Sequence, residues 1–136
     1  LQPPGTTRLY ATAEAVAGAH AEVLRRAHPH PQLVATPAAA GGKTDLEWLL
    51  HDLAGQGINE LHVEAGHKLN GSLLRAGLVD ELLVYLAPRL LGSGLGMADL
   101  GALTRLDESL DFEFLDAQRI GADLRLRARP AGRSGF

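Results

Sequence analysis

The sequence contains no cysteine, and this absence excludes two classes of structure. Without thiols the chain can form neither a disulfide framework nor a zinc site held by thiolates. A reducing, intracellular compartment is permitted, and we expect a cytoplasmic protein. Aromatic residues are also few, at 4% against 46% hydrophobic residues in total, so the core must depend on aliphatic packing.

Long apolar runs and blocks of one charge are missing too. The longest uninterrupted apolar run, 82–88, falls far short of the roughly 20 residues that a membrane-spanning helix needs. Arginines and acids are interspersed and the formal net charge is −3, so neither a membrane nor a nucleic acid is expected as a partner. At 136 residues the chain suits one domain better than two, and we expect a single domain over residues 1–136.

What the chain does contain is an alternation of strand and helix patterns. We predict strands at 8–12, 32–36, 58–64 and 78–87, helices at 15–24, 46–55 and 67–76, and a hairpin at 112–128 that turns near Gly121. Thr44 and Glu47 form a capping box before the second helix, and Gly77 closes the third. Helix, strand, helix and strand in succession predict a right-handed crossover between parallel strands. We therefore expect an α/β protein with a mixed, mainly parallel sheet flanked by helices and a C-terminal antiparallel hairpin.

The segment 60–82 carries the strongest functional signal. Glu64 ends a predicted strand and Gly66 starts the next helix, which is where ligands bind in open α/β sheets. The glycine lets a phosphate approach the backbone, and Lys68 could add charge. The amides of Lys68, Leu69 and Asn70 would point at that anion. An ordinary strand-to-helix turn explains the same glycine.

Two residues of this segment have two interpretations each. Glu64 either accepts hydrogen bonds from ligand hydroxyl or N–H groups, or is an acid favoured by the dipole at the helix start. Gly71 lies inside the first turns of a helix, where glycine costs about 1 kcal/mol relative to alanine. We infer that a close neighbour, either chain or ligand, requires it.

Histidine patterns in the chain have simpler explanations than metal binding. His20-Ala21-Glu22 and His62-Val63-Glu64 each match half of a zinc-deaminase signature, but the other half needs cysteines. His28 and His30 lie in a proline-containing loop without a neighbouring carboxylate in the sequence. We expect no metal site.

Two further patterns are also interpreted as structural. The glycine-rich stretch 92–96 resembles a phosphate loop only in composition, because no secure helix follows it, and we expect a turn there. Three arginines share one face of a predicted strand, and we expect them to pair with acids across the hairpin. The arginines are Arg125, Arg127 and Arg129, and the acids are Asp111, Glu113 and Asp116.

Three stretches together closely resemble the reductase domain of the bifunctional riboflavin-biosynthesis deaminase-reductase. They are Val63-Glu64-Ala65-Gly66-His67-Lys68-Leu69-Asn70-Gly71-Ser72-Leu73-Leu74, Gly77-Leu78-Val79-Asp80-Glu81-Leu82 and Ala87-Pro88-Arg89-Leu90-Leu91-Gly92. A looser resemblance extends from the strand around Leu9 to the closing hairpin. It therefore covers nearly the whole chain.

This resemblance implies a dihydrofolate-reductase-like fold that binds NADPH. The implied reaction reduces the ribosyl group of 5-amino-6-(5-phosphoribosylamino)uracil to ribityl, by direct hydride transfer without a covalent enzyme intermediate. Glu64 would contact the substrate. The residues that would line the NADPH site are Gly66, His67, Lys68, Leu69, Asn70, Gly71 and Ser72. The family commonly has proline and threonine at positions 67 and 68, and no catalytic residue is assigned.

The same resemblance implies that parts of the family's pattern lie outside this chain. In the family, further strands begin the reductase domain and a zinc deaminase domain precedes them, so the chain is expected to be the C-terminal part of a reductase domain. We expect it to be inactive alone and to form a homodimer. The alternatives are a reductase of the same fold with a different pterin-like or pyrimidine substrate, and an assembly module without activity.

Overall fold

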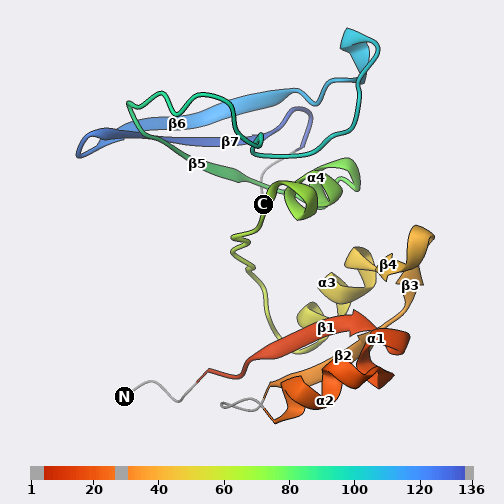
Figure 1. The fold of residues 1–136 in the computed structure, drawn as a ribbon. Coiled ribbons are helices and arrows are strands. Elements are labelled where there is room, and N and C mark those ends of the chain that lie inside the picture. The colour runs from red at the N-terminus through yellow and green to blue at the C-terminus, as the bar shows by residue number, and fades with distance from the viewer. Residues whose placement is uncertain (1–4, 27–30, 134–136) are drawn as a thin grey trace. The chain divides into compact units, whose positions relative to one another are not determined.

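The computed structural model describes residues 5–26 and 31–133. The chain divides into two compact units, residues 1–62 and 63–136, each of which is described by itself (Figure 1). His28 and His30 lie outside the described residues. In the part of the chain that the structure covers, no helix is long and apolar enough to cross a membrane.

The first unit is built on a parallel pair of strands. β1 (Arg8–Thr12) pairs with β2 (Gln32–Thr36) in a register that places Arg8 opposite Gln32. Both strands were predicted, and both are confirmed. Between them in sequence lie α1 (Ala13–Ala17) and α2 (Ala19–Arg25), separated at Gly18, whose backbone is extended at ψ 165°. The single helix predicted over 15–24 is therefore two short ones, because Gly18 interrupts the helical backbone.

The rest of the first unit leads to its longest helix. Residues 38–44 form a small antiparallel pair around a 3-10 turn: β3 (Ala38–Ala39), η1 (Ala40–Gly42) and β4 (Lys43–Thr44). α3 (Leu46–Gly55) follows. Its cap is Asp45, whose carboxylate accepts the Trp48 N–H at 2.9 Å, so the predicted capping box was placed one residue too early.

A tyrosine hydrogen bond joins β1 to α3. The Tyr10 hydroxyl donates to the Asp52 carboxylate at 2.7 Å, and the Gln56 amide donates to the same oxygen at 2.6 Å. Burial raises the pKa of Tyr10, and the hydrogen bond to Asp52 adds to this rise. The contact fixes the helix beside the parallel strand pair.

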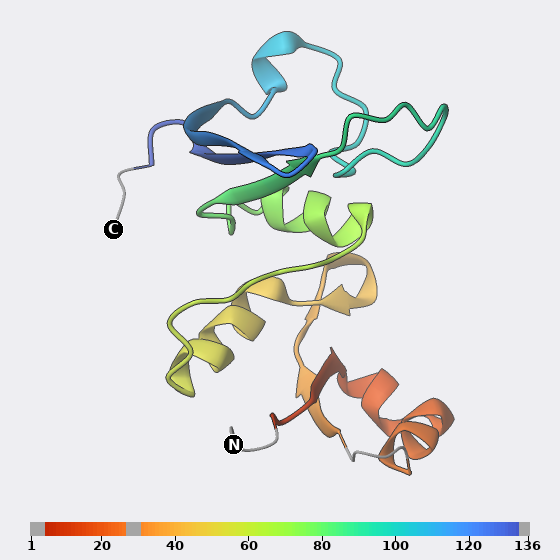
Figure 2. The same cartoon turned by 90° about the vertical axis from the view of Figure 1, so that its left-hand side faces the viewer.

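The second unit is a three-stranded antiparallel sheet with one helix. The strand order is β5 (Leu82–Leu86), β7 (Asp123–Pro130) and β6 (Phe112–Ile120), so β7 is central. α4 (His67–Arg75) lies along one face of this sheet in both views (Figures 1 and 2). η2 (Leu106–Glu108) is a single turn before β6. Leu73 and Leu74 of α4 and Ala128 of β7 are buried, and they mark the core of this unit.

The hairpin of β6 and β7 is confirmed, with Gly121 at its turn in the left-handed region (φ 61°). A bulge lies between Phe114 and Asp116, and it shortens the regular ladder of the edge strand β6.

Two of the predicted arginine pairs across this hairpin are confirmed. Arg125 bonds Asp116 at 2.7 Å and Arg129 bonds Glu113 at 3.2 Å. Arg127 instead donates two hydrogen bonds of 2.7 Å to Glu81, which precedes β5. These bonds hold the pKa of Glu81 below its usual range.

One predicted strand and one predicted topology were wrong. Residues 58–64 have no ladder to any described strand, so the parallel pair expected with the strand after α4 is not formed. The strand predicted over 78–87 is confirmed only over Leu82–Leu86, as β5, and it pairs antiparallel with β7. The alternating pattern of 58–64 favours an extended backbone, yet a strand also needs a hydrogen-bonded partner. The expected α/β composition is confirmed. The expected mainly parallel sheet is wrong, because β1 with β2 is the only parallel strand pair in the described chain.

Candidate functional site

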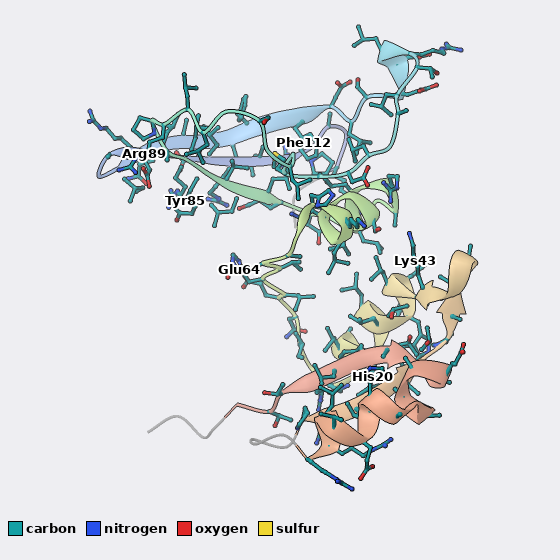
Figure 3. All side chains as sticks on the ribbon, viewed as in Figure 1. His20, Lys43, Glu64, Tyr85, Arg89 and Phe112 are labelled. Carbon is teal, nitrogen blue, oxygen red and sulfur yellow. The ribbon has the colours of Figure 1, made fainter. Side chains whose placement is uncertain are left out.

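The candidate site is the turn that leads into α4, in the second unit. Glu64 is exposed on the irregular segment before the helix (Figure 3), and Gly66 is the N-cap residue with φ −77° and ψ 165°. As a glycine, Gly66 has no side chain with which to cap this helix start. The helix dipole and the amides of the first turn therefore make this end favourable for an anion.

Gly66 is not required by the protein's own packing. Its φ is accessible to any amino acid, and a Cβ built at this position meets nothing within 4 Å. The open space in front of Gly66 is therefore available to a group that approaches the backbone. The contact of Gly66 with a phosphate stays a prediction.

The first-turn amides are only partly available. The Leu69 and Asn70 N–H groups each donate to the Gly66 carbonyl oxygen at 3.1 Å, so they do not point outward as predicted. The amides of His67 and Lys68 have no acceptor within the helix. They are the donors that this helix end can offer to a ligand, and the exposed Lys68 side chain stands beside them.

Gly71 has a close neighbour, and it is the chain itself. A Cβ at Gly71 would overlap the Asp99 carbonyl oxygen and would lie 2.5 Å from its carbonyl carbon. The Asp99 N–H donates to the His67 carbonyl at 2.9 Å, and Arg75 donates to the Asp99 carbonyl. Of the two explanations that the sequence left open for this glycine, packing against chain is the one observed.

The remaining predicted residues have their side chains engaged locally or exposed. The Asn70 amide donates to the Ala65 carbonyl at 3.2 Å and to the Met97 carbonyl at 2.9 Å. The Ser72 hydroxyl donates to the Lys68 carbonyl at 3.0 Å, within the helix. Leu69 is largely exposed. The structure thus places all the predicted residues on one turn and helix, but their side chains do not converge on one point.

The region also contains two residues that the sequence analysis did not identify. Met97 and Asp99 belong to an irregular loop, 87–105, that crosses α4. This loop contains the glycine-rich stretch 92–96, where no helix opens, as expected. The only sequence signal for its position was Gly71, which indicated a close neighbour without identifying it.

A cavity in the second unit lies apart from the candidate site. This cavity of about 280 Å³ lies at the other end of α4, bordered by Leu74, Val79, Phe112 and Arg133 among others, and none of the predicted site residues lines it. Within residues 5–26 and 31–133, no group of three or more histidine and carboxylate side chains is arranged to hold a metal ion.

Comparison with known proteins decides the family. The model of the RibD C-terminal domain family matches residues 5–126. The chain belongs to this family. The match includes the whole turn and helix described above, so the candidate site lies inside the family's domain.

Individual relatives agree with the RibD assignment. The riboflavin biosynthesis protein RibD of Escherichia coli is 46% identical over 86 residues, which are 62% of this chain and 23% of that protein. A 5-amino-6-(5-phosphoribosylamino)uracil reductase of Buchnera aphidicola is 36% identical over 65% of this chain and 43% of that protein.

A solved RibD structure has a similar fold. The structure of Acinetobacter baumannii RibD superposes with a TM-score of 0.66 at 30% identity, and it covers 75% of this chain and 27% of that one. The chain therefore spans about a quarter of the length of these RibD proteins.

Proposed function

We propose that this RibD C-terminal domain supplies part of an enzyme that reduces 5-amino-6-(5-phosphoribosylamino)uracil to its ribitylamino product. The observation that carries the proposal is the family match over residues 5–126, together with a relative that is named as this reductase. The reductase activity for which that relative is named implies a nicotinamide cofactor, and we propose that the cofactor is NADPH. When bound, this cofactor supplies the hydride that reduces the ribosyl carbon.

The start of α4 is the part of the chain that fits the cofactor's phosphates. Gly66 leaves open space in front of the backbone, it has no side chain of its own to cap the helix, and the amides of His67 and Lys68 have no acceptor within it. The Lys68 ammonium adds a positive charge at the same place. These residues would bind and orient the cofactor rather than take part in the chemistry.

Glu64 is proposed as a substrate-positioning residue. Its carboxylate is exposed two residues before Gly66, so one short turn carries both the substrate contact and the cofactor contact. A carboxylate accepts hydrogen bonds from the hydroxyl and N–H groups of a ribosylamino-pyrimidine. Holding the two reactants in fixed geometry is the main contribution that such a site makes to hydride transfer. No general acid is assigned.

The test is a reductase assay on the protein expressed at its natural length. The purified protein is mixed with NADPH and the phosphoribosylamino-uracil, and both NADPH oxidation and the ribitylamino product are measured. We expect oxidation of one NADPH for each product formed, and no oxidation without the substrate. If the protein reduces a different pyrimidine or a pterin but not the phosphoribosylamino-uracil, it is a reductase of the same fold with another substrate.

We also propose that the 136-residue chain alone is inactive and associates with itself. The support is the small core: among the described apolar residues only Ala21, Leu73, Leu74 and Ala128 are buried. Exposed apolar surface of this extent favours association with a second copy.

A further inference from the structure

The side chain of Asn70 joins two segments that are far apart in the sequence. Its Nδ2 donates to the carbonyl oxygen of Ala65, in the turn before α4, and to that of Met97, in the loop that crosses the helix. Because both neighbours are carbonyl oxygens, the nitrogen must be the atom that faces them. An amide nitrogen has two hydrogens, and both are used here.

This arrangement leaves Asn70 unsuited to bind a phosphate. Only its Oδ1 remains, which is an acceptor, and an anionic phosphate offers no hydrogen to it near neutral pH. The residue was expected to line the cofactor site by contact, but its two donors are committed to the chain itself.

The loop that Asn70 reaches is fixed to α4 at three further places. The Asp99 N–H bonds the His67 carbonyl at 2.9 Å, Arg75 bonds the Asp99 carbonyl, and Gly71 has no side chain where the Asp99 backbone passes. Asp99 also accepts the Gly101 N–H with its own carboxylate at 3.0 Å, which shapes the loop after it. Residues 97–99 thus lie against the first turns of α4 in one defined position.

The bond to Ala65 has a consequence for the site. The Ala65 carbonyl and the Gly66 N–H belong to one planar peptide group, so holding the oxygen sets the direction of that N–H. Glu64 precedes Ala65 in the chain, so a rotation of the Ala65–Gly66 peptide also displaces Glu64. A change at Asn70 would therefore rotate the turn that carries both proposed ligand contacts.

We propose that Asn70 is a positioning residue, which ties the 97–99 loop to the 64–66 turn and so sets the geometry of the cofactor and substrate contacts. The proposal rests on the proposed function for its effect on the reaction. Its structural part, the tie between loop and turn, stands on the two hydrogen bonds alone.

The experiment compares three variants in the protein expressed at its natural length. Asn70→Asp keeps the shape but replaces the two donors by acceptors that face two carbonyl oxygens. Asn70→Gln keeps the donors on a longer stem. Asn59→Asp makes the same change of charge on an exposed residue of the segment before the turn, and it serves as the matched control.

Steady-state kinetics and amide hydrogen exchange are measured for each variant. For Asn70→Asp we expect kcat to fall by about tenfold or more, with the KM for NADPH within about threefold, because misplaced reactants lose rate rather than ground-state binding. Exchange of the Asp99 N–H should become faster. Asn70→Gln should recover part of kcat, and Asn59→Asp should match the wild type.

Three results would overturn the proposal. One is an unchanged kcat in folded Asn70→Asp, even if its thermal midpoint falls. Another is a rise in the KM or Kd for NADPH that equals the loss of rate, with Asp99 exchange unaltered, which would make Asn70 a direct cofactor contact. The third is unaltered Asp99 exchange in every Asn70 variant.

If Asn70→Asp does not fold, Gly71→Ala displaces the same loop, and it should raise Asp99 exchange and lower kcat together; no change in either would again overturn the proposal. If the wild type shows no reductase activity, the proposed function fails, while the exchange comparison still decides whether Asn70 ties the loop to the turn.

Discussion

Gly66 and Gly71 lie five positions apart on the same turn and helix, but the structure explains the need for a glycine in only one of the two positions. The backbone of Asp99 occupies the space where a Cβ of Gly71 would lie. Nothing occupies the corresponding space at Gly66, whose φ of −77° suits any residue. A substitution at Gly66 therefore tests ligand approach with little effect on folding.

We predict that Gly66→Val weakens NADPH binding by about tenfold or more while the unfolding midpoint stays close to that of the wild type. The side chain would fill the space that the phosphates are proposed to enter. Titration of the cofactor by calorimetry, with thermal unfolding of the same sample, measures both quantities. Gly94→Val is the control, because its Cβ also meets nothing within 4 Å, and it lies in the glycine-rich loop. Equal affinities for wild type and Gly66→Val would remove the phosphates from this helix end.

Glu64 gives a prediction that separates the substrate from the cofactor. Glu64→Gln should lower kcat/KM for the uracil substrate by about tenfold or more, because a neutral amide is a weaker hydrogen-bond acceptor than a carboxylate. The Kd for NADPH should stay nearly unchanged. Glu60→Gln removes the same charge four residues earlier in the exposed segment and should leave both values unchanged. A loss of stability with normal kinetics would instead assign Glu64 to the start of the helix.

At the scale of elements, the sequence predicted α4 well because its signals are local. Its amphipathic pattern lies within the helix, and the closing Gly77 lies two residues after its end and adopts a left-handed φ of 66°. The hairpin of β6 and β7 was predictable for the same reason. Its apolar alternation and its turn glycine are neighbours along the chain.

Features that depend on distant residues were not predictable in the same way. Residues 58–64 have an alternating pattern, but a strand forms only with a partner, and the sequence does not name one. The contact of Gly71 with Asp99 spans 28 positions, and the bonds of Arg127 to Glu81 span 46. The candidate site was therefore predictable as a turn and a helix start, whereas the loop that crosses it was not.

The bonds between Glu81 and Arg127 predict a dependence of stability on pH. The hydrogen bonds from Arg127 lower the pKa of Glu81 in the folded state, so their stabilising effect is present above the unfolded-state pKa and is lost as the pH falls through the folded-state value. Glu81→Gln should thus lower the urea midpoint at pH 7 and have no effect at an acidic pH below the folded-state pKa, where the carboxyl is protonated in both states. Both side chains are partly exposed, so the effect should be small and should shrink in high salt. An equal difference at both pH values would show that the pair does not stabilise the sheet.

At the scale of the whole molecule, the chain buries little of its apolar surface. Many of its large apolar side chains are exposed, among them Leu86, Phe114 and Leu124 on the second unit's sheet, which are 57%, 74% and 38% exposed. Leu86 and Leu124 are paired across β5 and β7, so their side chains share one face.

We predict that the 136-residue chain is dimeric or larger in light scattering, because these exposed apolar side chains of the sheet favour contact with a second copy. Phe114→Asp should lower the mass toward that of one chain. Leu106→Asp, which changes an apolar residue that is 89% exposed outside the sheet, should have less effect. A monodisperse monomer across the concentrations tested would contradict this account of the surface.

The central claim is that this domain serves a reductase that transfers hydride from a nicotinamide cofactor to a ribosyl carbon. The most direct measurement is the reaction of the natural-length protein with NADPH that carries deuterium at the transferable position of the nicotinamide ring. The account predicts a ribitylamino product with a single deuterium, bonded to the carbon that was the ribosyl C1, because the hydride passes directly between the two reactants. A product without deuterium, or the absence of product under conditions where the protein is folded and binds NADPH, would contradict it.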